Sequence, residues 1–169
     1  MIHTRLVALV AATAAVALTM TSGAVALAAP RDSDITLVTY SKTVGFDTVD
    51  GNEAGIDHGD LFHREKAVSR TPGGAVIGVS YSQAEIVSYN VQDNVDVRRV
   101  QVQTRLPKGQ VFAIGITELK RGETPEPGWT DTYAVIGGTG KYAGARGTKS
   151  LLLLPDRQTF KVTWRLSLL

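Results

Sequence analysis

The sequence contains no cysteine, which excludes a disulfide framework, a thiolate nucleophile and a cysteine-ligated zinc or iron–sulfur centre. It also has little excess charge of either sign, because 18 Lys and Arg stand against 16 Asp and Glu in 169 residues. A nucleic-acid-binding surface needs a cluster of uncompensated positive charge, so we expect no nucleic-acid partner. The length corresponds to one ordinary domain, which excludes a second full domain.

The first 28 residues have the composition of a secretory signal peptide. One cation precedes the apolar run Leu6–Met20, and Ala26-Leu27-Ala28 provides the small residues that a signal peptidase requires. We expect cleavage after Ala28, a short tail over residues 29–34, and a secreted chain with no stable membrane insertion. The alternative is an uncleaved anchor, because the apolar run to Ala29 is long enough to cross a bilayer.

The remainder of the chain lacks helical periodicity and consists of alternating segments separated by turn residues. These segments predict strands over residues 35–42, 61–69, 75–89, 97–106, 110–119, 151–154 and 159–168. Thr71-Pro72-Gly73-Gly74 and Pro107-Lys108-Gly109 are turn sequences, and each predicts a hairpin between the strands beside it. Seven or eight such strands close either as a barrel or as a sandwich, and periodicity does not choose between them.

The alternation assigns faces to some strands and leaves others open. In the last strand Phe160, Val162 and Trp164 share one face, which predicts that this face is buried. In the strand over 75–89 either face can point inward. Inward placement of Tyr81 and Glu85 would give Glu85 an apolar environment suited to acid–base chemistry, whereas outward placement would solvate it. Leu151–Leu154 is apolar on both faces, which suggests that a neighbouring subunit covers one of them.

Motifs for metal, nucleotide or hydrolytic chemistry are weak. Gly137–Tyr142 lacks the glycine spacing and the hydroxyl of a phosphate-binding loop, and no Gly-x-Ser-x-Gly elbow is present. His58, Asp60 and His63 are donors of the type that bind metals, but His58 is predicted in a loop and His63 on a strand. We therefore expect no metal and no cofactor.

The segment Tyr133–Gly147, YAVIGGTGKYAGARG, is the most specific string in the sequence. It resembles the segment of allene oxide cyclases and dirigent proteins in which a strand enters a Gly-Gly-(Thr/Ser)-Gly turn followed by an aromatic residue and a further glycine. Gly59–Phe62 and Ile77-Gly78 are similar to these families in order and spacing, and the likeness covers most of residues 35–169. It implies an all-β fold, a small antiparallel eight-stranded barrel with a hydrophobic lumen, often assembled as homodimers or homotrimers. Arg146 matches a dirigent arginine.

The resulting interpretation is a secreted barrel that binds a hydrophobic small molecule and steers its cyclisation or coupling without a cofactor. Tyr81, Phe112 and Trp164 are the predicted ligand-binding wall residues, and Glu85 and Arg146 are the candidate catalytic residues. The alternative is a non-catalytic binding or self-associating module with a filled lumen. A hollow interior of several hundred Å³ would favour the first interpretation.

Overall fold

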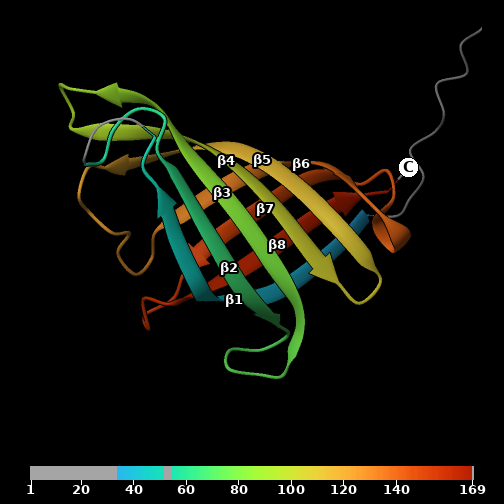
Figure 1. The fold of residues 1–169 in the computed structure, drawn as a ribbon. Coiled ribbons are helices and arrows are strands. Elements are labelled where there is room, and N and C mark those ends of the chain that lie inside the picture. The colour runs from blue at the N-terminus through green and yellow to red at the C-terminus, as the bar shows by residue number, and fades with distance from the viewer. Residues whose placement is uncertain (1–33, 52–54, 169) are drawn as a thin grey trace, which may run out of the picture.

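The computed structural model describes residues 34–51 and 55–168, so the predicted signal peptide and residues 29–33 of the predicted tail lie outside it. The described chain forms a closed barrel in which each strand pairs antiparallel with the next and β1 pairs with β8 (Figure 1). The elements are β1 (Asp34–Val49), β2 (Leu61–Ser69), β3 (Val76–Asn90), β4 (Val95–Leu106), β5 (Gly109–Lys120), β6 (Thr130–Gly138), the 3-10 helix η1 (Gly140–Tyr142), β7 (Arg146–Leu153) and β8 (Thr159–Ser167). No helix in these described ranges is long and apolar enough to cross a membrane.

This closure settles the choice between barrel and sandwich that periodicity left open. Both predicted hairpins, β2–β3 and β4–β5, are confirmed. The larger differences lie at three places. One is β6, which is missing from the strands predicted from the alternation. β1 continues past residue 42 to Val49 through a bulge between Thr43 and Gly45, and β7 begins at Arg146, five residues before the predicted apolar run.

One end of the barrel is filled by the chain segment that carries the family resemblance. η1 follows β6 and places Tyr142 and Ala145 in the buried core, where they pack with residues from the ends of neighbouring strands. Gly147, the second residue of β7, has φ +132°, and a Cβ there would lie 2.0 Å from the carbonyl oxygen of Arg165. Only glycine fits this close approach between β7 and β8.

The apolar core lies inside the barrel and is densest toward the end that Tyr142 closes. Along β8, Val162, Trp164 and Leu166 point inward and are buried, as the alternation predicts. The opposite end, where β3 meets β4 and β5 meets β6, is less apolar and contains buried charges. The barrel interior is therefore apolar toward the end with Tyr142 and carries charged side chains toward the opposite end.

Candidate ligand site in the barrel lumen

The lumen contains a cavity of about 370 Å³. Strand side chains form its walls, and two loops form its rim: residues 121–129, through Thr124 and Pro125, and residues 154–158, through Arg157 and Gln158. Thr124, Arg157 and Gln158 are exposed, so the cavity reaches the surface between these loops. An ion pair between Arg157 and Glu126 joins the two loops. A volume of this size accommodates a small organic ligand.

The cavity wall combines apolar surface with an unusual number of cations. Its apolar lining includes Ala84, Val100, Val102, Trp129, Leu151, Leu153 and Phe160. Four basic side chains, Arg64, Lys66, Arg98 and Lys149, line the same space. In the part of the chain that the structure describes, only Arg98 among these four forms an ion pair. The lumen therefore has a net positive lining, whereas the sequence interpretation predicted a hydrophobic one.

Aromatic rings lie beside these cations, of which only Arg98 also contacts a carboxylate in the described part of the chain. The Lys66 Nζ lies 4.5 Å from the centroid of the Phe160 ring, and the guanidinium of Arg98 lies 4.6 Å from that of Phe62. The Lys149 Nζ lies 5.4 Å from the ring centroids of both Tyr133 and Trp164. Cation–π contact compensates part of the loss of hydration but leaves the charges free to attract an anion.

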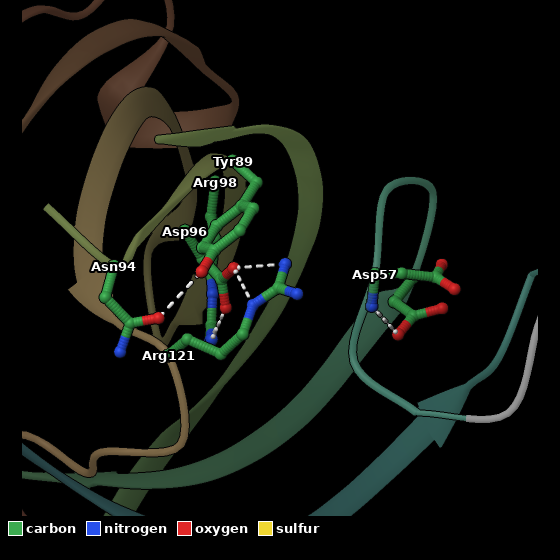
Figure 2. A network of polar contacts seen from close by, with 7 residues as sticks. Asp57, Tyr89, Asn94, Asp96, Arg98 and Arg121 are labelled. Atoms are coloured by element: carbon green, nitrogen blue, oxygen red, sulfur yellow. Dashed lines mark hydrogen bonds and ion pairs between the residues drawn. The ribbon is translucent and has the colours of Figure 1, made fainter. Parts of the chain in front are cut away.

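Arg98 is held in place by a buried carboxylate at the charged end of the barrel. Asp96, which is fully buried, accepts a hydrogen bond from Arg98 at 3.1 Å and one from the Nε of Arg121 at 2.9 Å (Figure 2). The Nη2 of Arg121 forms an ion pair with the same carboxylate at 2.8 Å. The Arg121 guanidinium lies over the ring of Tyr89, whose hydroxyl donates to Asn94. One carboxylate is thus shared by two guanidinium groups. The Nε of Arg98 is buried and has no partner among the described residues.

Burial of these cations lowers their affinity for protons. It lowers the pKa of Lys66 to about 8, with a smaller contribution from the positive charge of Arg64. Burial also lowers the pKa of Lys149 well below its usual range, and repulsion from Lys66 acts in the same direction against the attraction of Asp131. The pKa of Arg64 is lowered by burial and by Arg98. A bound anion would relieve this unfavourable cluster of charges.

Tyr133 belongs to a short hydrogen-bonded chain on the cavity wall. The hydroxyl of Thr117 donates its single hydrogen to Asp131, so the Tyr133 hydroxyl, 3.0 Å away, must donate to Thr117. Burial raises the pKa of Tyr133 above its usual range, which keeps the phenol protonated. Gly115 makes room for the ring, because a Cβ there would lie 2.4 Å from the Tyr133 Cδ1. The chain links the lumen to a carboxylate through two hydroxyl groups.

The predicted site residues are not brought together by this geometry. Trp164 lies inside the barrel, 1% exposed, and donates a hydrogen bond from Nε1 to the Thr39 hydroxyl at 3.2 Å. Tyr81 and Phe112 lie on the outer face, so the expectation that they line the lumen is wrong. The reason is the pleat: Ser80, Ala84, Val111 and Ala113 point inward instead.

The candidate catalytic residues also lie away from the lumen. Glu85 is on the outer face and forms an ion pair with Arg99, directly across from it on β4. The outward alternative for this strand is therefore the one that the structure supports. Arg146 is exposed and donates to the backbone carbonyls of Ile136 and Ala145, which shapes the glycine-rich turn.

Two other features of the sequence have structural positions. In the Leu151–Leu154 segment Leu151 and Leu153 are buried in the lumen, and Leu152 and Leu154 are partly exposed. Asp60 is buried and accepts hydrogen bonds from the backbone N–H groups of Gly51 and Asp57, so it organises the loop after β1. Within residues 34–51 and 55–168, no three His, Asp or Glu side chains gather as a metal site.

The lumen cations were missed by the sequence interpretation, although the sequence contains a signal for them. Arg64 and Lys66 are in phase with buried Phe62 and Val68 on β2, and Arg98 is in phase with Val100 and Val102 on β4. Lys149 is in phase with Leu151 and Leu153 on β7. A cation at an inward position of an alternating strand predicts a charged lumen.

A second hollow of about 500 Å³ lies over the outer faces of β1–β4. It is lined largely by outward side chains, namely Asp47, His63, Glu65, Tyr81, Gln83, Gln101 and Gln103, together with Gly45, Phe46, Arg64 and Ser82. This hollow is lined by carboxylates as well as by Arg64, which is the single Lys or Arg among its lining residues, whereas the lumen is lined by several cations. We therefore assign the ligand site to the lumen.

Comparison with known proteins supports the fold. No family model and no curated protein matches the chain. Among solved structures, pyocyanin demethylase aligns over 78% of this chain and 99% of its own, with a TM-score of 0.62 and 19% identity. AbnU, an exo-specific intermolecular Diels-Alderase, aligns over 79% of this chain and 98% of its own, with a TM-score of 0.61 and 16% identity.

A dirigent protein has the same architecture. The pterocarpan synthase dirigent protein GePTS1 aligns over 79% of this chain and 82% of its own, with a TM-score of 0.55 and 12% identity. At these identities the likeness establishes the fold. The protein is a closed eight-stranded antiparallel barrel of the type found in cyclases and dirigent proteins, as the sequence resemblance implied.

Proposed function

We propose that the lumen binds a largely apolar small molecule that carries an acidic group, and that it steers the cyclisation or coupling of this molecule. The observation that carries the proposal is the 370 Å³ cavity with an apolar wall and four basic side chains, Arg64, Lys66, Arg98 and Lys149. The apolar wall favours the carbon skeleton, and the charged side chains of Arg64, Lys66 and Arg98 favour a carboxylate, an enolate or a related anion. This refines the predicted hydrophobic ligand by adding a negative charge.

The same groups suit a reaction that needs mainly positioning. When the cavity holds two reactive ends of one molecule close together, the molecule no longer has to search many conformations. This lowers the activation free energy of the reaction by several kcal/mol. Fixed guanidinium and ammonium groups stabilise negative charge that develops on an acidic or carbonyl oxygen. Tyr133, hydrogen-bonded through Thr117 to Asp131, provides a group that can accept a hydrogen bond from the ligand. The analogy with AbnU, a Diels-Alderase, and GePTS1, a dirigent protein, supports this class of reaction.

The charge requirement is tested with two ligands of the same shape, 2-naphthoate and 2-naphthamide. We expect 2-naphthoate to bind at least about tenfold more tightly than 2-naphthamide. Tryptophan fluorescence measures the binding, because Trp129 lines the cavity and the Trp164 ring lies beside Lys149, which also lines it. Arg64→Met should remove most of this preference, whereas Arg105→Met, which deletes the same charge from an exposed position, should leave it unchanged. Equal affinity for the two ligands, or equal losses in the two variants, would contradict the proposal.

The reaction is tested with the natural ligand. Protein purified from the culture fluid of the producing organism should yield an acidic small molecule that mass spectrometry identifies. Cyclisation within one molecule is an isomerisation, so a precursor incubated with the protein should give a product of the same mass and a different chromatographic retention. Repeated recovery of empty protein, with no affinity for apolar acids, would refute the ligand-binding function.

We also propose that the protein acts outside the cell, as the composition of residues 1–28 suggests. N-terminal sequencing of protein from the culture fluid should then begin at Ala29. An intact Met1 in a membrane fraction would instead support the uncleaved anchor.

A further inference from the structure

Lys149 is the most deeply buried amine of the lumen. Its residue is 4% exposed, and it points inward from the middle of β7 into the cavity. Its direct neighbours across the sheet are Tyr133 on β6 and Trp164 on β8, and its Nζ lies 5.4 Å from both ring centroids. The amine is thus held between two rings at the wall of a cavity that reaches solvent.

The surroundings of Lys149 favour the neutral amine. In the described part of the chain its Nζ forms no ion pair or hydrogen bond, and the Asp131 carboxylate on β6 is engaged by Thr117. The other charged and titratable groups that line the cavity are Arg64 and Lys66 on β2, Arg98 on β4, Tyr133 on β6, and Arg157 in the loop after β7. Asp131 on β6 is a sixth group, which attracts the charged amine of Lys149. Four of these six are cations. A lysine whose amine is buried and is repelled by a nearby cation is an activated nucleophile.

We propose that Lys149 is an amine nucleophile that forms a covalent imine with an aldehyde or ketone group of the ligand bound in the lumen. This inference rests on the proposed function, because it uses the same cavity and requires a ligand that carries a carbonyl group as well as an acidic one. β-Keto acids and acidic aldehydes carry both a carbonyl group and an acidic group, and a cavity of this size holds both groups of one such molecule.

The chemistry is balanced without an oxidant or reductant. The lone pair of the Lys149 Nζ attacks the carbonyl carbon, the electrons of the C=O π bond move to oxygen, and a proton passes from nitrogen to that oxygen. Loss of water from this carbinolamine leaves a C=N bond, so one water is released for each imine formed. The positively charged form of the imine withdraws electrons from the adjacent carbon and makes it easier to deprotonate, which prepares a carbon nucleophile for ring closure.

The test traps the imine on the full protein. We would incubate it with 4-carboxybenzaldehyde and sodium cyanoborohydride near pH 7 and locate the reduced adduct by peptide mass spectrometry. Lys149 should be labelled at least about tenfold faster than the exposed lysines Lys108, Lys120 and Lys141, because only a neutral amine attacks the aldehyde. Lys149→Met should lose this adduct, and Lys141→Met, the matched exposed control, should keep it.

A second readout separates a reactive amine from a merely structural cation. Removing the repelling charge with Lys66→Met should move the pH midpoint of Lys149 labelling upward, since Lys66 acts to lower the proton affinity of Lys149. A purely structural role predicts no labelling and no such shift. Because the labelling pattern of the unmodified protein is informative by itself, the test does not depend on whether Lys149→Met folds.

The outcomes distinguish this inference from the proposed function. If 2-naphthoate binds in the lumen while adducts appear only on exposed lysines, the imine is refuted and the anion-binding function stands. If uncharged benzaldehyde labels Lys149 selectively while 2-naphthoate does not bind, the reactive amine stands and the acidic ligand is refuted. Failure of both experiments would overturn both proposals.

Discussion

Replacing Lys66 with methionine should stabilise the fold at neutral pH, because the charged amine is unfavourable where it lies. Burial lowers its pKa from 10.5 to about 8, which corresponds to about 3 kcal/mol of unfavourable free energy for the charged form. We therefore expect Lys66→Met to raise the free energy of unfolding at pH 7 by about 3 kcal/mol.

The sign of the pH dependence follows from proton binding in the two states. Between the folded pKa of about 8 and the unfolded value of 10.5, the unfolded chain binds more protons at Lys66 than the folded chain does. The free energy of unfolding of the parent protein therefore rises with pH between these two values. At any pH below 8, the charged Lys66 lowers the free energy of unfolding by its full amount. The advantage of Lys66→Met should be constant below pH 8, shrink as the pH rises, and vanish near pH 10.5.

Urea unfolding of the two proteins at a series of pH values between about 7 and 10.5 measures this difference. Lys141→Met, at an exposed position, is the control and should change stability little at any pH. The gain in stability should be accompanied by weaker binding of 2-naphthoate, because the cation that destabilises the empty barrel also attracts the anion. The reasoning would be refuted if Lys66→Met were less stable than the parent at pH 7, or if the difference in free energy of unfolding between the two proteins did not change with pH.

Two further substitutions test the structure around the lumen. Asp96→Asn removes the carboxylate shared by Arg98 and Arg121, and we expect the free energy of unfolding to fall by about 3 kcal/mol, measured by urea unfolding. Unchanged stability would mean that Asp96 does not hold the two arginines. Gly115→Ala places a Cβ against the Tyr133 ring, and we expect thermal unfolding to show a loss of about 1–3 kcal/mol. Gly45→Ala, whose Cβ would make only an ordinary contact with Glu65, is the matched control, and equal effects of the two changes would contradict the packing argument.

Two hairpins and the buried faces of two strands could be predicted from the sequence because they depend on local rules. Alternation identified β4 and β8 and their buried faces, and the turn residues before Gly74 and Gly109 fixed two hairpins. Barrel closure depends on the pairing of β1 with β8, which joins the two ends of the chain and leaves no local signal. Only the resemblance carried by Tyr133–Gly147 pointed to it.

The site was harder to predict because it depends on which face of each strand points inward. Aromatic residues at Tyr81 and Phe112 suggested a ligand wall, but their neighbours Ser80 and Val111 occupy the interior. Conversely, Lys149 and Arg98 are basic residues of a kind usually found on the surface, and only their phase relative to buried neighbours marks them as inward. The polar residues at inward positions, and not the outward aromatics, line the candidate site.

The central claim is that an anion binds inside the barrel against the basic side chains. A crystal structure of the protein with 2-naphthoate tests it most directly. We predict the naphthalene ring against Phe160, Leu151 and Val100, and the carboxylate within hydrogen-bonding distance of at least one of Arg64, Lys66, Arg98 and Lys149. A naphthoate found only in the outer hollow beside Tyr81, with the lumen free of ligand, would contradict it.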